Sequence, residues 1–381
     1  MVAVGLLLLP RFPTYHEDAW ILILYLASVV PQVFMYDWVG IGLEQMTWVG
    51  LVKTCRSLFY AVLVLLLLRY CDGWLGWPAQ RWVPLFFLAG FIASNRIMAW
   101  RVTRWLGGRV VPSFHGWSVW RERLGQAGPI GASNVTIRVV LGIDVILLGA
   151  LADPVIVGSY SAAAKILFVL IVAVEVLWKA FLPRLSRLWQ TSVTDFRRRF
   201  NSYLGLVWAG FLPVAAGGFV LGERMMAELY GDAFAGAGPV FRILSFSYVV
   251  LALGMFFGNT LIACDRQRAY FPPLLVSAVV AVAGNLWLVP RYGALGACWA
   301  MLTAHSLLFL TTAWICRQLL SRRLLWPVAI SVAASAIMVL GLIWLQAWPT
   351  WALVGVGLVL YGCVAGPPLW RWSRANPSTG V

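Results

Sequence analysis

Long apolar stretches that follow one another almost without interruption constrain this chain more than any other feature. The hydrocarbon core of a bilayer is about 30 Å thick, so a helix needs about 20 consecutive apolar residues to cross it. Eleven stretches reach that length. We expect each to be a helix, because only a helix or a closed barrel satisfies its own backbone groups in lipid. The expected spans are residues 18–39, 46–69, 82–103, 129–151, 156–180, 202–222, 239–263, 269–289, 294–316, 326–346 and 350–370.

The composition agrees with an all-α polytopic membrane protein, since 61% of the residues are hydrophobic and only 11% are charged. Short connections between the spans leave no room for a soluble domain. The first ten residues, MVAVGLLLLP, are apolar over only about half the length that a span requires. We therefore expect the chain to start with the end of a cut helix, a half-helix that precedes the eleven full spans.

The basic residues are distributed unequally between the two ends of the spans. Of the 29 Lys and Arg residues, 17 fall in the connections on one side, five on the other, and seven within the spans. Such an excess marks the cytoplasmic side. The sequence therefore predicts a cytoplasmic C-terminus, and this membrane topology explains the net charge of +15 without a nucleic-acid partner.

Nothing in the sequence indicates catalysis, a metal or a cofactor. The six Cys form no CxxC pair, and the three His, at 16, 115 and 305, are scattered. No nucleophile and base recur at a catalytic spacing, and no phosphate-binding loop is present. The longest expected external loop, 223–238, is short for a membrane glycosyltransferase or polymerase. We therefore expect a protein that is not an enzyme.

Several charged side chains lie inside the expected spans, where each costs at least about 2.5–3.5 kcal/mol. Such residues usually face protein or water and often mark a substrate path. Lys165 and Arg138 have no acid within one turn of their own helix, so we predict that both line a cavity and contact substrate. Asp144 is expected on the same helix as Arg138. It can bind a coupling cation, accept a proton, or act as counter-ion to Arg138 or Lys165, and we favour the last of these.

The other charges within spans have structural explanations that compete with a functional one. Glu175 and Lys179 are four residues apart and can neutralise each other, so they are either a structural pair or secondary charges of the cavity. Lys53 and Arg56 share a helix face near the cytoplasmic end. They can extend to the headgroups or support substrate binding.

Four ordered stretches form a recognisable set of motifs: YDWVGIGLEQMTW, then LGIDVILLGALADPVIVGSYSAAAKILF with a later Pro-x-x-Ser, then ELYGDAFAGAGPVFRILSF, and finally LVPRYGALGACWA. This set resembles Wzx-type lipid-linked oligosaccharide flippases of the MOP (multidrug/oligosaccharidyl-lipid/polysaccharide) exporter superfamily. The residues that match the first two motifs are Asp37, Trp38, Gly42, Leu43, Glu44, Met46, Asp144, Val157, Gly158, Tyr160, Ala162, Ala163, Lys165, Pro183 and Ser186.

The resemblance implies a MATE-like bundle of two lobes around a cationic cavity. The family begins with two spans that we do not find here, so we expect this bundle to lack its first two helices. A long loop with Trp117, Trp120 and Leu124 at helical spacing predicts an amphipathic linker on the cytoplasmic surface. The expected divisions are the remainder of an N-terminal lobe (1–110), this linker (111–128), a six-helix lobe (129–318), and two additional helices with a cytoplasmic tail (319–381).

The function implied by the resemblance is to flip an undecaprenyl-diphosphate-linked oligosaccharide repeat unit across the bacterial inner membrane, for O-antigen, lipopolysaccharide or exopolysaccharide synthesis. Arg138, Lys165, Asp144, Lys53 and Arg56 would be the substrate-binding residues. Membrane lipids, a polysaccharide polymerase and a chain-length regulator are the other partners that this implies. Two alternatives stay open: a small-molecule antiporter of the same superfamily, and a non-transporting scaffold of a polysaccharide assembly complex.

Overall fold

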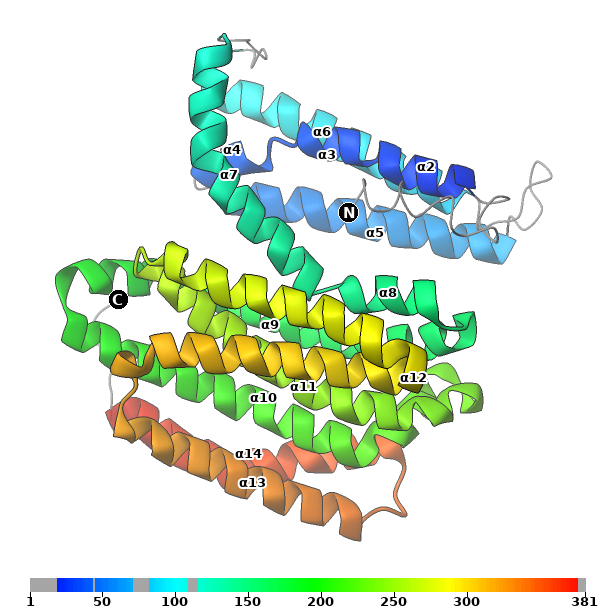
Figure 1. Ribbon diagram of the computed structural model, residues 1–381, viewed down its shortest axis with the longest axis vertical. Helices are drawn as coiled ribbons and strands as arrows, with labels where there is room; N and C mark the ends of the chain where they lie inside the picture. Colours follow the sequence, from blue (N-terminus) through cyan, green and yellow to red (C-terminus); the bar gives the residue numbers. More distant parts are fainter. Residues whose placement is uncertain (1–18, 44, 71–81, 109–115, 376–381) are drawn as a thin grey trace. The chain divides into compact units, whose positions relative to one another are not determined.

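The computed structural model describes residues 19–43, 45–70, 82–108 and 116–375, and every regular element in these ranges is helical (Figure 1). Nine of the described helices are long and apolar enough to cross a membrane, or ten when a bent pair at 131–151 counts as one span. One of them, α12 (Gln267–Ile315), bends at Gly293 and covers two expected spans. Every expected span therefore has a helical counterpart, which confirms the all-α membrane fold. The expected half-helix at 1–10 lies outside the described residues.

The chain divides into two compact units, Met1–Trp120 and Arg121–Val381. The division falls within the segment 111–128 that the sequence predicts as a linker. Of that linker, residues 116–128 are described, and they do not form a separate helix. They open α7 (Trp117–Val140), which runs from there into the next expected span without a break.

Unit 1 is built around two antiparallel helices that pack against each other, α5 and α6. The first expected span is divided into three short helices, of which α2 and α3 pack on α6 and α4 contacts both α5 and α6. Val49, Val52 and Met98 form its small buried core. The helices of this unit are α2 (Ala19–Ala27), α3 (Val29–Val33), α4 (Asp37–Gly42), α5 (Met46–Tyr70) and α6 (Val83–Leu106).

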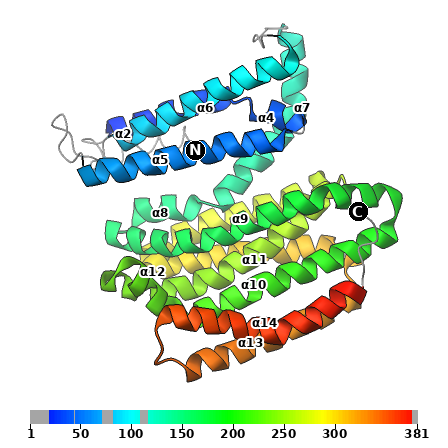
Figure 2. The ribbon, with the colours of Figure 1, turned by 180° about the vertical axis from the view of Figure 1, so that it is seen from behind.

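Unit 2 is a larger bundle centred on α11, the most buried of the described candidate spans, which packs against α9, α10 and α12. The helices α13 and α14 pack on each other and lie along α10 on the far side from α11 (Figures 1 and 2). Besides α7 and α12, the elements of this unit are α8 (Ile143–Leu151), α9 (Pro154–Thr191), α10 (Val193–Tyr230), η5 (Asp232–Ala237), α11 (Gly238–Ala263), η6 (Arg317–Leu319), η7 (Arg322–Leu324), α13 (Leu325–Trp344) and α14 (Thr350–Ala375).

The helices α9 and α10 are longer than the spans expected from hydropathy, with 38 residues each. At 1.5 Å per residue they extend for about 57 Å, well beyond the apolar core of a bilayer. Only Ser192 separates them. Its hydroxyl caps α10 by accepting a hydrogen bond of 3.3 Å from the backbone N–H of Asp195. The connection between the expected spans 156–180 and 202–222 is therefore helical on both sides of Ser192.

A sharp bend at Gly293 folds α12 back on itself. Gly293 has φ +55° and ψ −132°, a conformation that side chains with a Cβ atom rarely adopt. The two arms then pack closely, and the hydroxyl of Ser277 donates a hydrogen bond of 2.9 Å to the carbonyl oxygen of Ala304. The bend therefore turns one long apolar stretch into a helical hairpin.

Candidate functional site

A break in the polypeptide lies between the predicted site residues Arg138 and Asp144. The hydropathy of the sequence predicts both on one helix over 129–151, and that prediction is wrong. The helix α7 ends at Val140, α8 begins at Ile143, and the two axes differ by 51°. Arg138 is in the last turn of α7 and Asp144 in the first turn of α8. Each charge thus lies at the helix end where the macrodipole stabilises it, which helps to explain why the break is tolerated. Discontinuous helices of this kind are common at the binding sites of transporters.

Asp144 is buried in unit 2, with 4% of its surface exposed. Tyr160 of α9 donates a hydrogen bond of 2.5 Å from its hydroxyl to Oδ2 of Asp144. The other carboxylate oxygen, Oδ1, has no hydrogen-bond partner among the described residues. Asp144 forms no ion pair with Arg138 or Lys165, although the sequence analysis favoured it as their counter-ion. The Asp144 carboxylate is buried in the bundle, and its hydrogen-bond partner there is Tyr160.

Lys165 lies on the opposite side of α9 from the face that binds Asp144. The buried face of α9 includes Tyr160, Leu167 and Ile171, which pack into the main core of unit 2. Lys165 is exposed, and at helical spacing it shares its face with the exposed Val169 and Val172. Its exposed neighbours on this face are apolar, and Lys165 forms no ion pair with the described residues, although it lies within a candidate span.

The other charged residues that were predicted for the site in unit 2 are Arg138, Glu175 and Lys179, and no ion pair joins Arg138 or Glu175 to another described residue. Arg138 is exposed, and it has no acidic partner among the described side chains. Glu175 is exposed on α9, and the side chain of Lys179 lies outside the described residues, so the expected pair between them stays a prediction.

In unit 1 the predicted cations have partners that the sequence analysis did not foresee. Lys53 Nζ lies 2.9 Å from Oδ2 of Asp37, and this ion pair joins α5 to α4. The guanidinium of Arg56 lies over the ring of Phe91 on α6, 4.1 Å from its centroid. A cation over an aromatic face is stabilised by the ring quadrupole, so Arg56 also holds two helices together.

A second buried polar pair in unit 2 escaped the sequence analysis. Ser247 Oγ of α11 lies 2.8 Å from Nδ1 of His305 in α12, and both residues are buried. The ring of Tyr248 is adjacent to that of His305, with the centroids 6.5 Å apart. The two residues are 58 positions apart in the sequence, so no short motif predicts their contact. His305 also stands alone in an apolar stretch, which indicates no partner.

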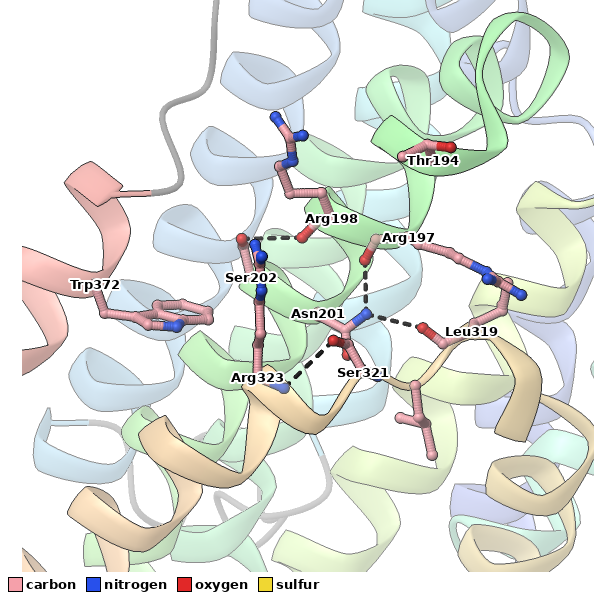
Figure 3. A pocket seen from close by; sticks show the side chains of 10 residues that line it. Thr194, Arg197, Arg198, Asn201, Ser202, Leu319, Ser321, Arg323 and Trp372 are labelled. Carbon is pink, nitrogen blue, oxygen red and sulfur yellow. Dashed lines mark hydrogen bonds between the residues drawn. The ribbon is translucent and has the colours of Figure 1, made fainter.

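The described part of the chain also contains a cavity of about 430 Å³ that none of the predicted site residues lines. It lies between the first turns of α10, the connection η6–η7 and the end of α14 (Figure 3). We call it the arginine pocket. Its lining includes Arg197, Arg198, Asn201, Ser202, Arg323 and Trp372.

The comparisons with known proteins connect this architecture to polysaccharide synthesis. Residues 1–189 match the model of a family described as "Polysaccharide biosynthesis protein". The chain is also 26% identical over 172 residues to the capsular polysaccharide biosynthesis protein CapF of Staphylococcus aureus. That alignment covers 44% of this chain and 43% of CapF, so it spans less than half the length of either protein.

The fold has a solved counterpart. A structure of the lipid II flippase MurJ in an inward closed conformation superposes with a TM-score of 0.67, at 11% sequence identity. The match covers 92% of this chain and 72% of MurJ. The family match and the fold together confirm the resemblance drawn from the motifs: this chain is a multi-pass membrane relative of the polysaccharide biosynthesis proteins, with an all-helical flippase fold consistent with the MOP exporter superfamily.

Proposed function

We propose that this protein flips an undecaprenyl-diphosphate-linked oligosaccharide repeat unit across the bacterial inner membrane, for O-antigen or exopolysaccharide synthesis, and that it is not an enzyme. The observation that carries the proposal is Lys165, an exposed cation without an acidic partner among the described residues, on the exposed face of α9 within a candidate span. The match to polysaccharide biosynthesis proteins supports a glycan-bearing lipid as the molecule that meets it.

The free-energy cost of placing a charged side chain in lipid indicates what the Lys165 face of α9 contacts. If Lys165 faced lipid, it would cost at least about 2.5–3.5 kcal/mol, so this face of α9 is expected to meet water or substrate. A diphosphate offers anionic oxygens that bind ammonium and guanidinium groups strongly. In this proposal Lys165 and Arg138 neutralise the diphosphate, and the prenyl chain stays in lipid. An exporter of cationic drugs would be expected to present an acidic or aromatic surface instead.

Asp144 has a different role in the proposal. Because it is buried and bound to Tyr160, it does not contact the diphosphate directly. It fixes α8 against α9 next to the helix break, and its second oxygen is available to a proton or a cation. Lys53 and Arg56 stay proposed as supporting contacts, with Asp37 and Phe91 holding them in place.

The basic connections give the proposed orientation. The side that holds 17 Lys and Arg residues would face the cytoplasm, and the C-terminus would lie there. A polysaccharide polymerase and a chain-length regulator would then act on the flipped product on the opposite side.

The test is a flipping assay with the full chain in phosphatidylcholine vesicles that contain undecaprenyl diphosphate carrying a fluorescently labelled oligosaccharide. Without flipping, a membrane-impermeant reductant quenches only the outer-leaflet label. We expect this protein to bring the inner-leaflet label to the reductant as well, and to leave labelled phosphatidylcholine where it is. Quenching equal to that of protein-free vesicles would contradict the proposal and favour a scaffold.

A further inference from the structure

The arginine pocket concentrates positive charge at one end of unit 2. Three of its lining residues are Arg197, Arg198 and Arg323, and no acidic side chain in the described part of the chain lines it. Arg198 has one acidic neighbour, Asp195, at 4.0 Å, and both side chains are about half exposed. A pair that exposed contributes little, so most of the positive charge of the pocket stays uncompensated.

Two of these arginines lie close to the N-terminal end of a helix. Arg197 and Arg198 lie in the first two turns of α10, which begins at Val193. The N-terminal end of a helix carries a partial positive charge from its unsatisfied N–H groups, and it stabilises anions rather than cations. An anion in the pocket would therefore interact favourably with the guanidinium groups and with the helix end at once.

The walls of the pocket are held in place by hydrogen bonds. Asn201, which is buried, donates from Nδ2 to the carbonyl oxygens of Arg197 at 2.6 Å and Leu319 at 2.8 Å. Its Oδ1 accepts from the backbone N–H of Ser321 at 3.0 Å. One side chain thus fixes the connection η6–η7, and with it Arg323, against α10 (Figure 3).

The aromatic wall is fixed by packing. Trp372 of α14 lies against Gly205 of α10, where a Cβ atom would come within 3.1 Å of the indole ring. Pro327 of α13 contacts the same place. The pocket is therefore assembled from α10, the η6–η7 connection and the end of α14, three segments that are far apart in the sequence.

We propose that the arginine pocket binds a phosphate group. Guanidinium groups form charge-assisted, bidentate hydrogen bonds with phosphate oxygens, and three arginine residues line a cavity whose volume lies within the roughly 300–1,000 Å³ of small-molecule sites. Both an anionic phospholipid headgroup and a soluble phosphate have this chemistry. The location favours the lipid, because the pocket lies at the ends of the candidate spans of α10 and α13 and is bordered by a Trp.

The experiment is native mass spectrometry of the full chain purified in detergent. The protein is titrated with phosphatidylglycerol, with zwitterionic phosphatidylcholine, or with inorganic phosphate. The pocket variant is the triple substitution Arg197→Gln, Arg198→Gln and Arg323→Gln. The matched control, Arg266→Gln, Arg268→Gln and Arg317→Gln, removes the same charge from three residues that do not line the pocket.

For the wild type and the control we expect one tightly retained phosphatidylglycerol and no matching retention of phosphatidylcholine. In the pocket variant the affinity for that lipid should fall by roughly tenfold or more. If inorganic phosphate binds the wild type and phosphatidylglycerol does not, the ligand is a soluble phosphate and the lipid source is rejected. If the pocket variant retains both probes as the wild type does, or the control loses them equally, the proposal is overturned.

The single variant Arg323→Gln guards against a folding defect in the triple variant, because Arg323 is exposed and lies outside the long helices. It should keep the melting temperature of the wild type and still bind the phosphate probe more weakly. Arg323→Lys should lie between the two, because it keeps the charge and loses the bidentate geometry. Unchanged binding by Arg323→Gln would also count against the proposal.

Discussion

Tyr160 of α9 donates a hydrogen bond to the buried carboxylate of Asp144 in α8, with the two oxygens 2.5 Å apart. The pair joins two helices directly after the break that follows Arg138. A buried charged group is costly unless it is paired or hydrogen-bonded, so this contact stabilises the start of α8. The motif residues Asp144 and Tyr160 are thus explained by their contact with each other.

The substitution Tyr160→Phe should lower the free energy of unfolding by about 1–3 kcal/mol, because it leaves a buried carboxylate oxygen without its donor. Thermal melting in detergent measures this. The matched control is Tyr270→Phe, which removes the hydroxyl of another buried tyrosine that has no hydrogen-bond partner among the described residues, and it should change the melting temperature little. Combined with Asp144→Asn, the loss from Tyr160→Phe should be less than additive. Strict additivity would show that the contact contributes nothing.

The substitution Gly293→Ala should destabilise unit 2 by about 1–3 kcal/mol, since the bend of α12 needs a positive φ of +55° with ψ −132°. Gly210→Ala on α10 is the control. Gly210 is helical, and a Cβ atom there would meet nothing within 4 Å, so alanine should stabilise by about 0.5–1 kcal/mol. The melting temperatures of the two variants should move in opposite directions. A neutral Gly293→Ala would show that the bend does not require that conformation.

Breaking the ion pair between Lys53 and Asp37 should have a small effect on stability. Lys53 is 46% exposed, so Lys53→Met should cost no more than about 1 kcal/mol. The exchanged pair, Asp37→Lys with Lys53→Asp, should restore the melting temperature that Lys53→Asp alone lowers. If the exchange gives no recovery, the pair does not join α4 to α5.

Two buried thiols next to the ends of the spans provide a test by pH. Burial raises the pKa of Cys264 to about 11 and that of Cys316 to about 12. Maleimide reacts with the thiolate, so labelling of Cys264 in the folded protein should be slow at neutral pH and rise about tenfold per pH unit until about pH 11. In the unfolded chain both thiols should react near their usual pKa of about 8.5. Peptide mass spectrometry separates them from the exposed Cys55 and Cys363. Rapid labelling of Cys264 at neutral pH without unfolding would contradict its burial.

The sequence predicted the spans well because hydropathy reports directly on what lipid excludes. All eleven expected spans have helical counterparts, and the hairpin at Gly293 lies between two of them as expected. The break after Arg138 was missed, because Leu141 and Gly142 interrupt a run that is apolar on both sides. Hydropathy does not distinguish a bent span from a straight one.

The partners of the predicted site residues could not be found from local spacing. Asp144 and Tyr160 are 16 residues apart, and Lys53 and Asp37 also lie on different helices. The arginine pocket combines residues 194–202 of α10, residues 319–323 of the η6–η7 connection and Trp372 of α14, which are far apart along the chain. Spacing along the chain gives no signal for this pocket, because it is the hydrogen bonds of Asn201 with Leu319 and Ser321 and the packing of Trp372 on Gly205 that bring the three segments around one cavity.

The most direct test of the account is the flipping rate of the Lys165→Met variant in vesicles that contain the labelled undecaprenyl-diphosphate oligosaccharide. Methionine preserves much of the side-chain length and removes the charge, so the rate should fall by roughly tenfold or more while the melting temperature stays unchanged. Lys165→Arg should keep much of the rate. The control Arg291→Gln, an exposed cation held near the ring of Trp287, should keep all of it. A Lys165→Met protein that flips as fast as the wild type would contradict the assignment of this face of α9 to the diphosphate.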